Sequence, residues 1–402
     1  MRGGLGLGTA ASRGALAVVW EAALDALSLS TSANAAELQA ALVALGFLYT
    51  RPSVATVQTS ASEVVTVGID VDVPRVGNAG YGQGLVIEDA RTNVAYFSHA
   101  IGTAGGWNAG TAATTTGYAA GPDGAAGTAT RIAGGAGAFG TYSNRPAPSA
   151  GATSYVGSVW ARLVNRAIYP SIQPASPTPT ANRFSSTPGH DLWFRSSTPV
   201  RTASSAYCFQ THDPGASVDA AFDFAQVEAG TWASEAIVTV GATATRAADR
   251  LAIDASRIVR SGRVGLALRA ILKGSIGGSN DYAADPYLWR YDASNYCTIN
   301  RTTGAATVVI AGASYTTASG FTAARGDVVD YWVEAGGGAL QTVVKARKNS
   351  GAVTTLGTGA AQGTHPSATS MDLLSNAATA PLSAWLQLAQ AYAPGRRIAW
   401  AA

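Results

Sequence analysis

Two short stretches decide the fold. The first is GLVIEDARTNVAYFS at residues 84–98, and the second is AQVEAGTWAS at residues 225–234, followed by ATRAADRL at residues 244–251. Polar side chains stand among apolar ones in both: Glu88, Arg91 and Asn93 in the first, and Glu228 and Arg246 in the second. We interpret all five as structural residues. Arg91 is expected to pair with a neighbouring carboxylate and Asn93 to fix a turn, with Glu228 and Arg246 paired likewise.

Charged side chains are scarce. They make up 13% of the 402 residues, about half the usual share in soluble globular proteins. Glycine and alanine are abundant, which favours a β-rich, closely packed, multi-subunit surface. The net charge of +3 is too small to indicate a nucleic-acid partner. Residues 250–402 carry 14 basic and 8 acidic side chains, an excess of six, which indicates a modest preference for anionic partners such as acidic polysaccharide.

The N-terminal region predicts an attachment segment. A Gly-rich arm at residues 1–13 precedes an amphipathic helical pattern over residues 14–29, and a second helical pattern ends at Gly46. Two short helices cannot bury their apolar faces alone, so we expect them to bind sister subunits or a portal, capsid or tail protein. No membrane insertion is expected, because Glu21 and Asp25 interrupt the longest apolar run.

Strand-like alternation covers much of the remaining chain, for example at Val65, Val67 and Ile69, and many short strands with Gly and Pro turns are typical of an all-β sandwich. The stretches quoted above resemble the opening and closing strands of a β-sandwich module found in phage head spike fibre and tail fibre proteins. Trp107 and the turn at residues 120–124 also resemble that module. The resemblance spans residues 70–255 and implies a fold and a particle, not a reaction.

The expected fold is mainly β: tandem antiparallel jelly-roll sandwiches of concanavalin A-like type with a short N-terminal helical anchor. We expect three parts: the arm and helical attachment segment at residues 1–50, a first β-sandwich at residues 51–250, and a second, lectin-like β-sandwich at residues 251–402. Residues 84–98 and 222–229 should be neighbours in one sheet system of the first sandwich.

No motif in the sequence predicts catalysis, a cofactor or a metal. The four histidines are scattered, and Cys208 and Cys297 are expected to be buried free thiols. Glycoside hydrolysis needs two carboxylates ~5–9.5 Å apart. Asp223 and Glu228 should point to opposite faces of one strand, while Asp330 and Glu334 should share a face at roughly 13 Å. We therefore predict no enzyme activity, no cofactor and no metal site.

Aromatic residues favour a glycan-binding face instead, because sugar rings stack on Trp and Tyr. The candidates are Tyr282, Tyr287, Trp289, Tyr291 and Trp193. An alternative stays open, in which Tyr287, Trp289 and Tyr291 are core residues on one side of a strand.

The resemblance implies a virion structural protein, either a head spike or a tail fibre. Its N-terminus would bind capsid, portal or tail proteins, and its sandwiches would bind host surface polysaccharide. A homo-oligomer, most often a trimer in such fibres, would be assembled in the host cytoplasm and released with the particle. Two other functions remain open: a polysaccharide depolymerase, and a purely structural cement or baseplate protein.

Overall fold

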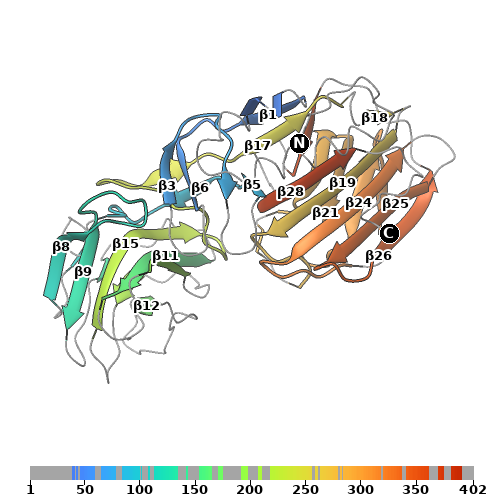
Figure 1. Ribbon diagram of the computed structural model, residues 1–402. Helices are drawn as coiled ribbons and strands as arrows, with labels where there is room; N and C mark the ends of the chain where they lie inside the picture. Colours follow the sequence, from blue (N-terminus) through green and yellow to red (C-terminus); the bar gives the residue numbers. More distant parts are fainter. Residues whose placement is uncertain are drawn as a thin grey trace, which may run out of the picture.

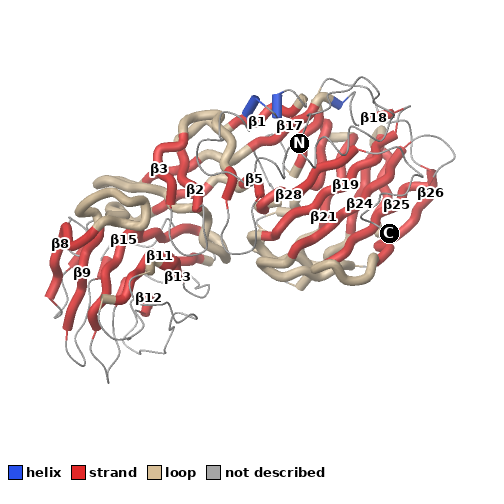
Figure 2. Tube along the Cα trace, viewed as in Figure 1, coloured by secondary structure: helices blue, strands red, loops and turns tan. Residues whose placement is uncertain are grey.

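The computed structural model describes a mainly β chain of antiparallel sheets (Figures 1 and 2). The described residues are 39–40, 42–43, 46–58, 65–77, 84–99, 101, 107–108, 113–134, 142–143, 154–164, 171–174, 192–197, 207–210, 218–255, 259–260, 263–278, 281–282, 284–317, 320–336, 341–361, 370–374 and 382–391. The expected arm and the first amphipathic helix lie outside these residues. Residues 39–40 and 42–43 are helical, and Gly46 has φ 80°, as expected of a residue that ends a helix.

Two large sheets pack face to face in the lobe drawn at the right of Figure 1. The first has the order β1 (Phe47–Thr50), β17 (Arg250–Ile253), β27 (Met371–Leu373), β20 (Tyr287–Asp292), β21 (Asn295–Ile299), β22 (Ala306–Ile310) and β23 (Ala313–Thr316). The second has the order β26 (Thr354–Ala361), β25 (Gln341–Lys348), β24 (Val328–Gly336), β19 (Arg263–Leu272), β28 (Ala384–Ala391), β5 (Gly84–Ile87) and β4 (Val76–Gly77), with β18 (Val259–Arg260) beside β19. We call the first the seven-stranded sheet and the second the eight-stranded sheet.

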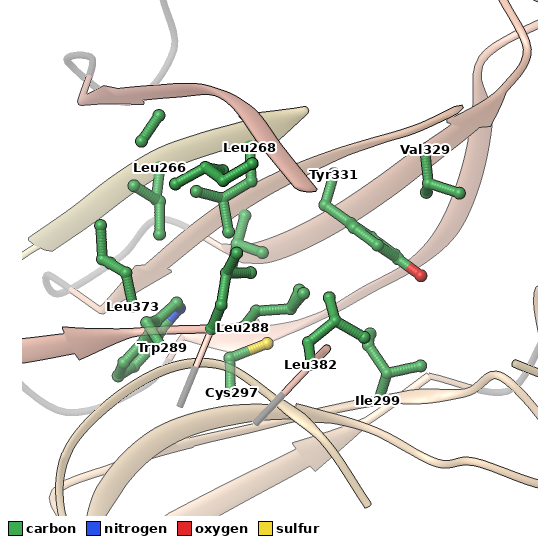
Figure 3. Packing of buried hydrophobic residues seen from close by; sticks show 14 of the residues in the cluster. Leu266, Leu268, Leu288, Trp289, Cys297, Ile299, Val329, Tyr331, Leu373 and Leu382 are labelled. Atoms are coloured by element: carbon green, nitrogen blue, oxygen red, sulfur yellow. The ribbon is translucent and has the colours of Figure 1, made fainter. Parts of the chain in front are cut away.

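Alternation along each strand builds the core between these sheets. In β24, Val329, Tyr331 and Val333 face inward and are at most 1% exposed, whereas Asp330 and Glu334 alternate with them on the outer face. Leu266 and Leu268 of β19 face the same interior as Trp289 and Cys297 from the opposite sheet (Figure 3). Cys297 is a free thiol and fully buried, as expected for that residue.

The second lobe, at the left of Figure 1, is built on a five-stranded sheet. Its order is β13 (Phe194–Ser197), β11 (Tyr155–Leu163), β15 (Val218–Ala229), β9 (Ala129–Gly134) and β8 (Ala113–Ala119). Two short ladders accompany it, β7 (Trp107–Asn108) with β10 (Tyr142–Ser143) and β12 (Ser171–Pro174) with β14 (Tyr207–Gln210). Both faces of the sheet are buried, because Tyr155 and Val159 lie in one apolar cluster and Trp160 and Phe224 in another.

Two ribbons join the lobes. The hairpin of β2 (Ala55–Gln58) and β3 (Val65–Ile69) covers part of the outer face of the eight-stranded sheet, where Val57 packs on Val86 and Ile271. The ribbon of β6 (Arg91–Asn93) and β16 (Ala244–Arg246) carries the chain out to the second lobe and back. The second lobe is therefore inserted between β5 and β17.

This topology corrects the expected division at residues 50/51 and 250/251. Strand β1 pairs with β17, and β5 pairs with β28, so residues 47–50 and 84–87 belong to the sandwich expected to begin only at residue 251. The expected pairing of the quoted stretches is right only after β5: Val94 N donates to Val227 O (2.9 Å) and Ala225 N to Ser98 O (2.9 Å). A strand motif predicts local conformation, but it does not show which distant strand will be its neighbour.

Candidate functional site

The most unusual feature of the described chain is a cluster of buried ionic side chains where the two lobes meet. It gathers Tyr49, Arg51, Arg75, Glu88, Glu235, Arg246, Asp249 and Lys273, none more than 3% exposed. We call this cluster the ionic junction. Its members follow or precede strands of both lobes: Glu88 follows β5, Asp249 precedes β17, and Glu235 lies beyond β15. Charges at such depth are stable only when they are paired and hydrogen-bonded.

Glu88 and Asp249 form the centre of the ionic junction. Glu88 N donates to Asp249 Oδ2 (2.9 Å), and Asp249 N donates to Glu88 O (2.8 Å). The strand leaving for the second lobe and the strand returning from it are thus locked side by side. Each carboxylate also forms ion pairs with cationic side chains from other elements.

The Glu88 carboxylate is bonded on both oxygens. Lys273 Nζ (2.6 Å) and Glu235 N (3.1 Å) donate to Oε1, while Arg75 Nη2 (3.2 Å) and Arg246 Nη1 donate to Oε2. Asp249 accepts from the Tyr49 hydroxyl and from Arg75 Nη2, and Arg51 Nη1 lies 3.6 Å from its Oδ1. Both carboxylates are therefore compensated by cations that come from the inserted lobe's flanks and from the large sandwich.

The arginines also bind backbone carbonyls, so they tie loops to the ionic junction. Arg51 donates to Asp70 O (2.7 Å) and Ile69 O (3.1 Å), Arg75 donates to Thr56 O (2.8 Å), and Arg246 donates to Asp89 O (2.7 Å). These bonds fix the hairpin of β2 and β3 and the turn after β5. The geometry is that of a rigid joint.

Lys273 and Glu235 connect the end of β19 to the inserted lobe through a 2.9 Å ion pair. Burial lowers the pKa of Lys273 to about 7, although Glu235 opposes that shift. Burial also lowers the pKa of Arg246 to about 9, with Arg75 adding to the effect. For Glu235, burial is outweighed by Lys273, Arg195 and Arg75, which lower its pKa. The ionic junction thus holds three carboxylates and four basic side chains. Loss of the Lys273 proton leaves equal numbers of negative and positive charges in it.

The five residues interpreted as structural all lie in or beside this region. Arg91 Nε donates to Asp89 Oδ1 (3.0 Å), so its pairing with a neighbouring carboxylate is confirmed, and its guanidinium lies 4.5 Å from the Trp232 ring centroid. Arg246 pairs with Glu88. Glu228 instead accepts from Ser234 N (2.6 Å) and Ser234 Oγ (2.7 Å).

The Asn93 side chain makes four hydrogen bonds to backbone groups. Its Nδ2 donates to Ala225 O (3.1 Å) and Ile237 O (2.8 Å), and its Oδ1 accepts from Ala95 N (3.0 Å) and Val227 N (3.0 Å). The fully buried amide thus holds β15 beside the chain that follows β6. This confirms a turn-fixing role and extends it to a contact between distant segments.

A second polar cluster lies at a bulge of β15. His99 Nδ1 lies 2.7 Å from Asp223 Oδ1, and Thr128 Oγ1 donates to Asp223 Oδ2 (2.8 Å). Burial disfavours the imidazolium, but the hydrogen bond and charge of Asp223 outweigh it and raise the pKa of His99. Phe224 has φ 49°, an unusual value for a bulky residue, which marks the bulge that aims Asp223 at His99.

The candidate glycan-stacking residues are only partly where that role requires them. Trp289 is 0% exposed, Tyr282 5% and Trp193 7%. Trp289 lies in the core beside Leu373 (Figure 3), and the Tyr282 hydroxyl donates to Ser383 O (3.2 Å). These three have no ring face open to a sugar, so the prediction is wrong for them. Tyr287 and Tyr291 are partly exposed, but Tyr291 packs against the core.

The carboxylates considered for hydrolysis are held by other groups. Asp330 is bonded by Arg269 Nε (2.7 Å) and Arg347 Nε (2.8 Å) on the outer face of the eight-stranded sheet. Asp223 and Glu228 are both buried and bind His99 and Ser234. In the described parts of the chain, no group of three His, Cys, Asp or Glu side chains is arranged to hold a metal.

No family model matches the sequence, and no curated protein is significantly similar to it. Within the described residues, no helix is long and apolar enough to cross a bilayer.

Proposed function

We propose that this chain is a structural protein of a phage or phage-like virion, a head spike or tail fibre that displays β-sandwich modules to the host surface. The observation that supports this most is the ionic junction, because it braces the inserted lobe against the large sandwich through a buried network of ion pairs and hydrogen bonds. A projecting fibre needs such stiffness to hold its outer module away from the particle. The motif resemblance of residues 84–98 and 225–251 agrees with that role.

The proposed arrangement has three tasks. The N-terminal residues attach to a capsid, portal or tail protein, the inserted lobe acts as a spacer, and the large sandwich meets host polysaccharide. Several copies, a trimer in our proposal, would convert weak single contacts into tight attachment.

The test is incorporation into particles. A truncation at residue 50 is unsuitable, because it would remove β1 and Tyr49 from the core and the ionic junction. Deleting residues 2–38 leaves both. We expect this shortened chain to fold, with an unchanged near-ultraviolet circular dichroism spectrum, but to be absent from purified particles by mass spectrometry. Full-length chain in the same preparation is the control. Incorporation of the shortened chain at the full-length level would contradict N-terminal attachment, and absence of the full-length chain would contradict the virion role.

A further inference from the structure

The outer face of the seven-stranded sheet carries two aligned rows of side chains. Along β21 and β22, Cys297, Ile299 and Val308 point into the core, so Tyr296 and Thr307 point outward. The first row crosses the strands as Tyr287, Thr298, Thr307 and Thr316, and the second as Arg290, Tyr296, Val309 and Ser314. Neighbouring members of a row stand ~4.8 Å apart, the spacing of strands in a sheet.

Two tyrosines and an arginine form the aromatic end of these two rows. Tyr287 and Tyr296 pack edge to face with ring centroids 5.7 Å apart, and the Arg290 guanidinium lies 5.7 Å from the Tyr287 centroid. All three are partly exposed, unlike the buried Trp289. A β-bulge between Tyr287 and Trp289 causes this difference, because it places Leu288 and Trp289 both inward and leaves Tyr287 outside.

Hydroxyl groups continue the face beyond the tyrosines. Thr307 Oγ1 and Thr316 Oγ1 lie 3.0 Å apart at the surface, and Thr298 stands between Tyr287 and Thr307 in the row. Hydroxyls both donate and accept, as sugar hydroxyls do, and the C–H face of a pyranose packs on an aromatic ring. The face therefore offers stacking at one end and hydrogen bonding at the other, in a line across four strands.

The charges on this face cancel. Arg250 Nε is bound to Asp372 Oδ1 (2.7 Å), and Asp372 stands opposite Arg290 in the register. Arg290 Nε donates to Asp292 O (3.2 Å), and the Asp292 carboxylate accepts from Ser294 N (2.7 Å). This face thus carries two arginines and two aspartates, whose charges cancel. The excess positive charge of residues 250–402 lies partly on the opposite side, where Arg269, Lys345 and Arg347 share the outer face of the eight-stranded sheet.

We infer that Tyr287 and Tyr296, with Arg290 and the threonine row, form a binding face for a neutral polysaccharide. This inference rests on the proposed role in host attachment and deepens it. It replaces the acidic polysaccharide indicated by composition, because the charges around the two tyrosines cancel. Stacking and hydroxyl bonding should give weak single-site binding that salt hardly changes.

The test uses the full chain on surfaces coated with dextran, yeast mannan or alginate, with biolayer interferometry at low salt and at high salt. We expect retention on dextran or mannan that is insensitive to salt. Each of Tyr287→Ala and Tyr296→Ala should weaken it roughly fivefold, the effect of losing one aromatic contact. Tyr287→Phe should retain most binding, because the ring remains. Tyr118→Ala is the matched control, since Tyr118 is an exposed tyrosine of the other lobe.

Three outcomes would overturn the inference: no retention on either neutral polymer, equal retention of both alanine variants and wild type, or retention on alginate alone that salt removes. Thermal unfolding and light scattering of each variant show whether folding or the oligomeric state has changed. If the alanine variants alter only the oligomeric state, the face is a contact between copies and the inference is wrong. Particle incorporation is measured separately, so failure of this face leaves the proposed virion role testable.

Discussion

Glu88 and Asp249 are 161 residues apart in the chain, yet each donates its backbone N–H to the other residue, Glu88 to a carboxylate oxygen and Asp249 to a carbonyl. The pair stands where the chain leaves the large sandwich and where it returns. Around it, Arg75 bonds both carboxylates at once. This pair therefore fixes the geometry between the inserted lobe and the sandwich that contains it.

Replacing Glu88 by Gln should strongly destabilise the protein. The change removes one of the two buried carboxylates that pair with Lys273 and with Arg75, and it removes the carboxylate that pairs with Arg246. Breaking a buried ion pair from one side costs about 3–5 kcal/mol. Urea unfolding of wild type and Glu88→Gln measures the loss. Asp292→Asn, at an exposed carboxylate, is the control and should cost less than about 1 kcal/mol. A Glu88→Gln protein as stable as the control would mean that the network does not stabilise the joint.

Gly230 should not tolerate a side chain. It has φ 132°, and an added Cβ would overlap Arg91 Nη1, so Arg91 would have to leave Ala229 O and Trp232. Gly230→Ala should lower stability by more than the ~1–3 kcal/mol of backbone strain alone. Gly124→Ala is the matched comparison, because Gly124 also has positive φ (78°) but nothing within 4 Å of an added Cβ. Equal melting temperatures for the two variants would contradict the steric argument.

Lys273 should make stability rise with pH above neutrality. Its pKa is lowered from 10.5 to about 7 in the folded protein, so between these values the unfolded chain binds one more proton than the folded chain. Stability then increases with pH by at most ~1.4 kcal/mol per unit. Below pH 7 the folded protein carries the full cost of the buried ammonium. The difference in unfolding free energy between wild type and Lys273→Met, followed from pH 7 to pH 9, isolates this effect. Parallel pH profiles would contradict it.

His99 should have the opposite effect, so that its contribution to stability falls as pH rises. Its pKa is raised above 6.5 in the folded protein, so its pairing with Asp223 contributes stability that is complete below pH 6.5 and lost as pH rises through the raised value. His99→Gln removes the charge and keeps a donor. The wild type should exceed this variant in stability most at pH 5.5 and least at pH 8.5, with the imidazole followed by NMR titration. An imidazole pKa below 6.5 would refute this prediction.

Local sequence patterns predicted the hydrogen bonds between residues that are close together in sequence. Arg91 bonds Asp89, two positions away, and Asn93 bonds Ala95 N, as short-range pairing rules indicate. The strands were also predictable in type, because alternation such as that of β24 is a local signal. Gly46 ends its short helical segment for an equally local reason.

The ionic junction was not predictable, because its partners are distant in sequence. Lys273 is 185 residues from Glu88, and only the insertion of a whole lobe between β5 and β17 brings them together. Strict alternation would put Tyr287, Trp289 and Tyr291 on one side of a strand, and the structure does not follow it. The bulge after Tyr287 shifts the pattern by one residue, so Trp289 enters the core and Tyr296, on the next strand, becomes the outward partner. Bulges leave no clear mark in a single sequence.

Imaging labelled particles tests the central claim most directly. Gold bound to a tag after Ala402, viewed by electron cryo-microscopy of purified particles, reports where the large sandwich lies. We expect gold in repeated clusters at a constant distance outside the head or along the tail, since a stiff ionic junction holds the module at one reach. Particles without gold, in a lysate where the tagged chain is abundant and folded, would contradict the virion role.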